Sequence, residues 1–124
     1  METRAISDRQ ISASSQWDAN HAAIQGRLNF QAGGGKAGGW SAGSNNANQW
    51  LLVDLGSEFT KVTGVATQGR NNHGQWVTKY KLEYSKDGVH FQYYREQGRN
   101  ENKAKELFEN CSSIRIYRLP TLSV

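Results

Sequence analysis

The feature that most limits the fold of this chain is a short alternation near its middle. In residues 79–84 (KYKLEY), apolar side chains alternate with charged ones. An alternation with a period of two predicts a strand that buries one face and turns its charged face to solvent. The turn-forming sequence SKDG follows at residues 85–88, where Gly88 can adopt a positive φ. Residues 89–94 are then predicted to form the return strand of a hairpin.

Other segments also favour strands. Residues 49–55 are apolar and end before Gly56, residues 61–68 are rich in Val and Thr, and Ile114 and Ile116 mark a late strand. Only residues 102–110 have a helix-like sequence. No linker or internal repeat divides the 124 residues. Short strands separated by turns therefore predict a single all-β domain over residues 1–124, either a sandwich or a barrel.

Charge and cysteine content narrow the range of functions. The net charge is +4, but the basic residues are scattered, so the sequence predicts no nucleic-acid partner. Mild basicity favours acidic partners such as anionic lipids or sulfated glycans. The single cysteine, Cys111, excludes an intrachain disulfide and fits either a reducing compartment or a fragment. No stretch is apolar enough to span a bilayer, and no signal peptide follows Met1.

Catalytic motifs are missing from the sequence. The three histidines are far apart, there is no Gly-x-Ser-x-Gly motif, and no Cys/His cluster suggests zinc. Cys111 has no obvious base beside it. We therefore expect a binding protein without enzymatic activity and without a cofactor.

Two segments have the composition of binding loops. The first supplies Trp17, Asp18, Asn20 and His21, and the second supplies Arg70, Asn71, Asn72, His73 and Gln75. A tryptophan in a loop offers a large rigid contact surface, and amides and guanidinium groups recognise hydroxyl and carboxylate groups. The alternatives are that Trp17 folds back onto the core and that the polar groups bind the loop to itself. For Gln68 we expect such internal bonding, and we expect Trp76 to pack inside.

Several short motifs, taken in order, resemble the discoidin family, also called the coagulation factor 5/8 type C family. They cover about residues 1–95. The matching segments are Met1-Glu2, QISASS at 10–15, Gly26-Arg27-Leu28, Trp40, QWLLVDLG at 49–56, TQGR at 67–70, QWVT at 75–78, and Tyr80 to Gly88. The set is specific because the motifs occur with ordered spacing, although each alone would be weak.

The resemblance implies an eight-stranded, jelly-roll-like antiparallel β-sandwich of the galactose-binding type. In this family, loops at one end of the barrel bind galactose-type sugars, anionic phospholipid or collagen. By position, Trp17 lies in the first of these loops and Arg70 matches the cleft arginine. Trp40, Trp50, Trp76 and Tyr80 match positions that are mostly core. The resemblance also implies an extracellular or cell-surface location, although without a signal peptide a cytoplasmic one stays open.

Among these ligands we expect a glycan. The loop over residues 30–39 offers only Phe30 and glycines, which weakens the lipid interpretation. Residues 71–75 contain no carboxylate, which weakens the collagen interpretation. A structural calcium ion also lacks support, because residues 31–39 contain no carboxylate to bind it. A further alternative is an accessory module of a carbohydrate-active enzyme whose catalytic part lies on another chain.

The C-terminal third departs from the family pattern. Residues 113–117 fit the penultimate strand, but a final strand and both cysteines of the usual terminal disulfide are missing from the pattern. A missing strand would expose a sheet edge. We therefore expect the domain to be incomplete and the isolated chain to be marginally stable or oligomeric, or to receive a strand from a partner.

Overall fold

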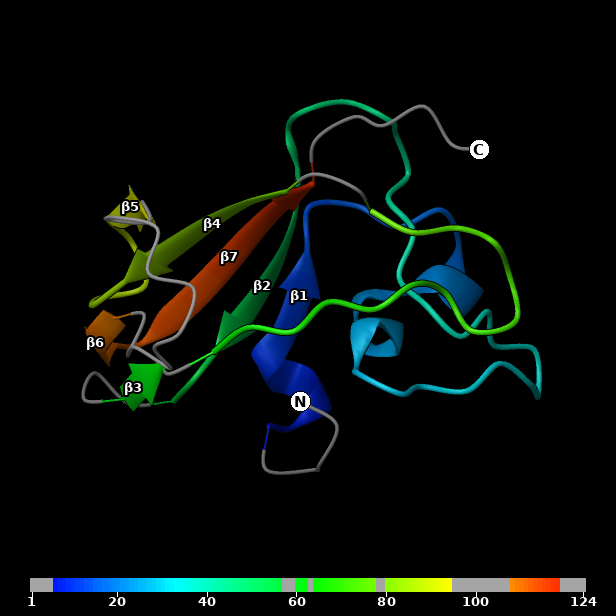
Figure 1. The fold of residues 1–124 in the computed structure, drawn as a ribbon, viewed down its shortest axis with the longest axis horizontal. Coiled ribbons are helices and arrows are strands. Elements are labelled where there is room, and N and C mark those ends of the chain that lie inside the picture. Colours follow the sequence, from blue (N-terminus) through cyan, green and yellow to red (C-terminus); the bar gives the residue numbers. More distant parts are fainter. Residues whose placement is uncertain (1–5, 57–59, 63, 78–79, 95–107, 119–124) are drawn as a thin grey trace, which may run out of the picture.

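The computed structural model describes residues 6–56, 60–62, 64–77, 80–94 and 108–118. Within them lie seven strands and three short 3-10 helices (Figure 1). The strands are β1 (Ile11–Ala13), β2 (Gln49–Asp54), β3 (Thr60–Val62), β4 (Tyr80–Ser85), β5 (Phe91–Tyr93), β6 (Phe108–Cys111) and β7 (Ser113–Arg118). The helices are η1 (Asp8–Gln10), η2 (Ala19–His21) and η3 (Ala23–Gly26).

The strands form two antiparallel sheets, as expected for an all-β sandwich. The larger sheet has the order β1-β2-β7-β4-β5, and the smaller pairs β3 with β6. The chain that follows β3 runs across one face of the larger sheet (Figure 1). On that face Leu82 and Ile114 form the buried core with Val62 of β3, and Val65 packs against this cluster. The core therefore lies between the larger sheet and the β3 segment.

The hairpin predicted in the middle of the chain is confirmed. β4 pairs with β5, and Gly88 in the connecting turn has φ +78°. The return strand is shorter than predicted, because the amides of Val89 and His90 both donate to the Asp87 carboxylate within the turn, each at 2.8 Å. Only Phe91–Tyr93 therefore remains extended.

The charged face of β4 differs from the prediction. Glu83 is only 5% exposed, because its carboxylate accepts a hydrogen bond from Arg115 Nε on the neighbouring strand β7 at 2.7 Å. Tyr80, expected on the buried face, is 41% exposed. The alternation therefore predicts the strand correctly, but it does not predict which charged side chain finds a buried partner.

Two other predictions were wrong in part. The strand expected over residues 61–68 is limited to Thr60–Val62, and residues 64–68 have no regular structure. The helix expected over residues 102–110 is contradicted at its end, because residues 108–110 belong to β6 and pair with β3. Residues 102–107 lie outside the described part. Pairing between distant segments has overridden local propensity here.

The late strand is confirmed as β7, which lies in the middle of the larger sheet between β2 and β4. We expected the chain to lack the final strand of the family. Residues after 118, where that strand would begin, lie outside the described part. That expectation and the oligomeric state therefore stay predictions.

A buried arginine anchors the N-terminal segment to the loop end of the domain. Arg27 is 6% exposed and lies directly after η3. Its Nη2 donates to Asp8 Oδ1 and to the carbonyl of Ile6, each at 2.7 Å, and its Nε also donates to Asp8 Oδ1 at 3.2 Å. The charged pair fixes the chain where it leaves η3, shortly before the glycine-rich loop described next.

Candidate ligand-binding loops

Three loops meet at one end of the domain. They are loop 1 (residues 16–22), loop 2 (residues 29–40) and loop 3 (residues 68–77). The backbone of Ala37 in loop 2 connects them: its N–H donates to the carbonyl of Asn20 at 3.0 Å, and its carbonyl accepts from Arg70 Nε at 3.0 Å. The carbonyl of Gly38 also accepts from the N–H of Asn71 at 3.2 Å. The two predicted binding segments are thus joined through loop 2.

The close approach of loops 2 and 3 requires glycine at position 38. Gly38 has φ +75°, a region that residues with a Cβ rarely adopt. A Cβ there would lie 2.9 Å from both the backbone nitrogen of Ala32 and the Cβ of Asn71. Real Cβ atoms do not approach so closely, so only glycine lets the two loops keep this contact.

Loop 1 displays Trp17. Its backbone N–H donates to the carbonyl of Ser41 at 2.8 Å, while its side chain is 69% exposed. The Asp18 carboxylate next to it accepts from Asn20 N–H at 2.9 Å and lies 2.6 Å from His21 Nδ1. The hydrogen bond with His21 holds the pKa of Asp18 below its usual value. Asp18 therefore shapes the turn that starts η2, and Trp17 is the side chain presented to solvent.

Loop 3 is closed by Arg70 and Gln75. The Arg70 N–H donates to the Gln75 carbonyl at 2.9 Å, and Arg70 Nη1 donates to Gln75 Oε1 at 2.8 Å. Asn71 has a mainly structural role, because its Oδ1 accepts from Ala32 N–H at 2.9 Å and its Nδ2 donates to Gln31 at 3.3 Å. Arg70 Nη2 has no hydrogen-bond partner within the described residues, so its donors are left for a ligand.

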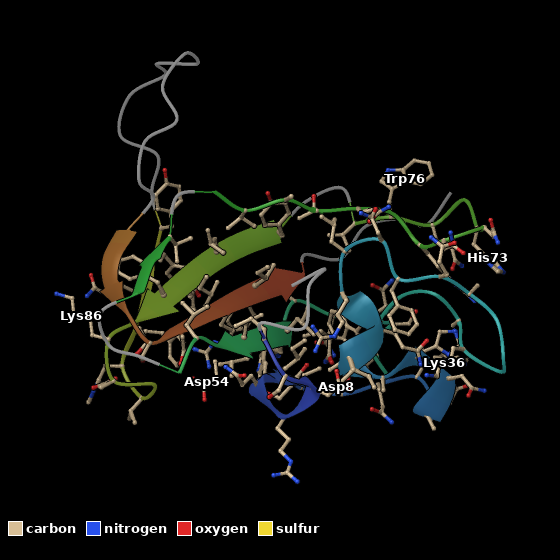
Figure 2. All side chains as sticks on the ribbon, turned by 90° about the horizontal axis from the view of Figure 1, so that it is seen from below. Asp8, Lys36, Asp54, His73, Trp76 and Lys86 are labelled. Carbon is tan, nitrogen blue, oxygen red and sulfur yellow. The ribbon has the colours of Figure 1, made fainter. Side chains whose placement is uncertain are left out.

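The tip of loop 3 is exposed. Asn72 has φ +59°, and the His73 side chain has one contact within the described residues, from Nδ1 to the carbonyl of Asn71 at 3.2 Å. Figure 2 shows His73 and Lys36 of loop 2 at the same end of the domain. Imidazole, amide and ammonium groups are thus available to a ligand at this end.

Two expectations for loop 3 need correction. Trp76, expected inside, is 59% exposed and points away from the body of the domain in Figure 2. It lies on a segment without strand pairing, so no sheet holds its ring against the core. Gln68 does not bind loop 3 to itself; its Oε1 accepts from Asn29 N–H at 2.7 Å and ties loop 3 to the start of loop 2. Trp40 and Trp50 are half-buried.

All nine predicted site residues thus lie on two loops that the structure brings together. The sequence did not indicate the bridging role of Ala37 and Gly38, because that role rests on backbone groups and on a missing Cβ. The described residues hold no group of three or more His, Cys, Asp or Glu side chains that could bind a metal ion. Among them there is also no helix long and apolar enough to cross a membrane.

Comparison with known proteins agrees with this architecture. The family model of the F5/8 type C domain matches residues 10–118. The chain belongs to the F5/8 type C (discoidin) domain family. It is 39% identical to lactadherin of Rattus norvegicus over 140 residues, covering 99% of this chain and 32% of the relative. It is also 39% identical to EGF-like repeat and discoidin I-like domain-containing protein 3 of Homo sapiens, over 115 residues that cover 83% of this chain and 22% of that protein.

Solved structures of F5/8 type C domains show the same fold. Recombinant discoidin II of Dictyostelium discoideum superimposes with a TM-score of 0.69 at 25% identity, covering 92% of this chain and 51% of that one. The F5/8 type C domain thus spans about a third or less of the curated relatives and about half of the solved neighbour. Family membership supports a non-catalytic binding module with a galactose-binding-like β-sandwich.

Proposed function

We propose that this F5/8 type C domain is an extracellular recognition module that binds a glycan through loops 1 and 3. The observation that carries the proposal is the junction at Ala37, which ties Asn20 of loop 1 and Arg70 of loop 3 into one frame. A rigid frame lowers the entropy lost when a ligand binds, so modest contacts suffice.

The chemistry of the displayed groups suits sugar hydroxyls. Arg70 Nη2 offers hydrogen-bond donors, and the Asn72 amide offers both donors and an acceptor. The Trp17 ring gives a flat apolar surface against which a sugar ring can lie. No carboxylate is exposed on loop 3, so neutral or acidic sugars meet no repulsion there.

A glycan array with the intact chain tests the proposal. Trp17→Ala and His73→Ala should each lower binding at least tenfold, because each removes a group displayed to the ligand. Both side chains carry little of the loop packing, so the fold should be kept. Val89→Ala is the matched control, since Val89 is 73% exposed on the β4–β5 turn. Binding that survives both loop substitutions, or that falls equally in the control, would overturn the assignment.

An anionic phospholipid surface is a second candidate, favoured by one specific observation. Besides Trp17, the loops expose Trp76 and Val77, the latter 39% exposed, and Lys36 lies at the same end. Bulky apolar groups beside a cation suit insertion between anionic headgroups. The three loops together therefore expose more apolar surface than the sequence of the glycine-rich loop 2 alone predicts.

Co-sedimentation with vesicles separates the two candidates. If lipid is the ligand, vesicles of phosphatidylserine and phosphatidylcholine should retain the chain, while pure phosphatidylcholine should not. Lys36→Ala should then weaken retention, and Lys86→Ala should not, because Lys86 lies at the opposite end of the domain (Figure 2). Equal retention on both vesicle types would exclude an electrostatic lipid site.

A further inference from the structure

The larger sheet has a second face with unusual chemistry. We call it the outer face, because it lies opposite the core cluster of Leu82 and Ile114. Its members are Trp50, Leu52, Lys81, Glu83, Phe91, Tyr93, Arg115 and Tyr117. The register places them side by side: Glu83 pairs with Arg115, which pairs with Leu52 on its other side. The next row on this face joins Lys81, Tyr117 and Trp50 in the same way.

Arg115 is the centre of this face. Its guanidinium carbon lies 3.9 Å from the ring centre of Phe91, 5.1 Å from that of Tyr117 and 5.7 Å from that of Trp50. Aromatic faces attract the guanidinium and hold its plane in place. The only hydrogen bond it makes within the described residues runs from Nε to Glu83 Oε2 at 2.7 Å.

Among the residues that the structure describes, this geometry leaves Nη1 and Nη2 without a hydrogen-bond partner. A bidentate ion pair would engage two parallel N–H groups, but Glu83 is engaged through Nε alone. Nη1 and Nη2 therefore keep their donors, although the Arg115 side chain is only 21% exposed. A fixed, partly desolvated pair of donors is the arrangement that recognises a planar carboxylate.

The charges and rings around Arg115 define the rest of the ligand. Lys81 Nζ lies 5.5 Å from the Tyr93 ring centre, so two cations flank Glu83 on this face, and the alternation along β2 places Asp54 at its far end. Tyr93 is 52% exposed. The charge of Glu83 raises the pKa of Tyr93. A tyrosine hydroxyl is neutral at physiological pH even without such a shift, so that of Tyr93 keeps its proton. The cations of Arg115 and Lys81 favour an anion at their end of the face, and the exposed Tyr93 ring favours a flat partner.

We propose that the outer face is a second binding surface, which takes an acidic sugar by its carboxylate at Arg115 and by its ring against Tyr93 or Tyr117. An acidic peptide fits less well, because peptides commonly add to a sheet through free backbone groups at an edge. The strands β2, β7 and β4 are each paired on both sides, so this part of the face offers no such edge. The proposal is independent of the loop site.

Nuclear magnetic resonance of the four tryptophan indole N–H groups tests it in the intact chain. The probes are tetragalacturonic acid and its fully methyl-esterified form, which differ only in their free carboxylates. We expect the acid to shift the Trp50 signal and the ester to leave it unchanged. Arg115→Lys keeps the charge but loses the fork, so it should weaken the acid at least tenfold.

Controls separate this site from the loops and from nonspecific charge effects. Lys81→Gln changes an exposed side chain and should weaken binding of the acid severalfold. This variant keeps the test valid if Arg115→Lys fails to fold. Lys36→Gln removes the same charge at the loops and should have no effect. Trp17→Ala should leave the Trp50 shift intact, even if the loop site proves not to bind glycan.

Three results would overturn the proposal. The first is equal Trp50 shifts from acid and ester, and the second is equal weakening by Lys81→Gln and Lys36→Gln. The third is a Trp50 shift of the same size and affinity with tetraglutamate, which would assign the outer face to acidic peptide instead.

Discussion

Replacing Gly38 with alanine should disconnect the two candidate loops at a predictable energetic cost. The added Cβ would lie 2.9 Å from the Ala32 backbone nitrogen and from the Asn71 Cβ, and neither can move without shifting a loop. The positive φ, +75°, also disfavours any residue with a Cβ. The conformational part costs about 1–2 kcal/mol, and the overpacked contact costs about 1–3 kcal/mol more.

Gly34→Ala is the matched control for this change. Gly34 also lies in loop 2 with a positive φ, +58°, but a Cβ there would meet no atom within 4 Å. It should therefore cost only the conformational part, about 1–2 kcal/mol. For a domain of this size we expect Tm to fall by roughly 4–8 °C for Gly34→Ala and by roughly 8–19 °C for Gly38→Ala.

The assay is thermal unfolding followed by circular dichroism, with glycan binding measured on the same samples at 20 °C. Gly38→Ala should lose binding, because the hydrogen bond from Asn71 to residue 38 would be strained, whereas Gly34→Ala should keep it. Equal Tm shifts in the two variants would refute the steric argument. Unchanged binding in Gly38→Ala would show that the junction of loops 2 and 3 does not form the site.

Other predictions concern different parts of the domain. Asp8→Ala removes the Asp8 carboxylate from the buried Arg27 guanidinium and should lower the free energy of unfolding, measured in urea, by about 1–3 kcal/mol; no change would mean that water replaces the pair. The hydrogen bond with Asp87 raises the pKa of His90. The pair therefore stabilises the folded protein fully at pH values below the unfolded-state pKa of His90. This stabilisation is lost as the pH rises through the folded-state pKa. The urea midpoints of wild type and His90→Gln should therefore differ more at pH 6 than at pH 9, and a pH-independent difference would contradict this. Trp17→Ala should change the free energy of unfolding by less than about 0.5 kcal/mol, whereas a large loss would show that the ring packs on the core.

Local sequence patterns predicted the parts of the fold that local forces decide. The β4–β5 hairpin follows from an alternation and a turn containing Gly88, all within 15 residues. The burial of Glu83 was not predictable in this way, because its partner Arg115 is 32 residues further along the chain. Strand β6 was mistaken for helix for the same reason, since its pairing with β3 is a contact between distant segments.

The candidate site was predicted residue by residue but not as an assembly. Trp17 and Arg70 were singled out by side-chain chemistry and by the family resemblance, and the structure places them on loops that share the Ala37 junction. The glycine-rich loop 2 carried no chemical signal, since its contribution lies in backbone carbonyls and in a missing Cβ at Gly38. Trp76 was misplaced because its position in the family pattern suggested core.

The loop residues fall into two groups, those that hold the loop backbone in place and those that extend into solvent. Asp18 and Asn71 accept hydrogen bonds from backbone N–H groups of loops 1 and 2, so they hold the backbone frame of the loops. Trp17 and His73 extend from that frame without carrying it. We therefore expect that exchanging the side chains that extend outward alters binding at little cost in stability, whereas exchanging the residues that hold the frame lowers stability first.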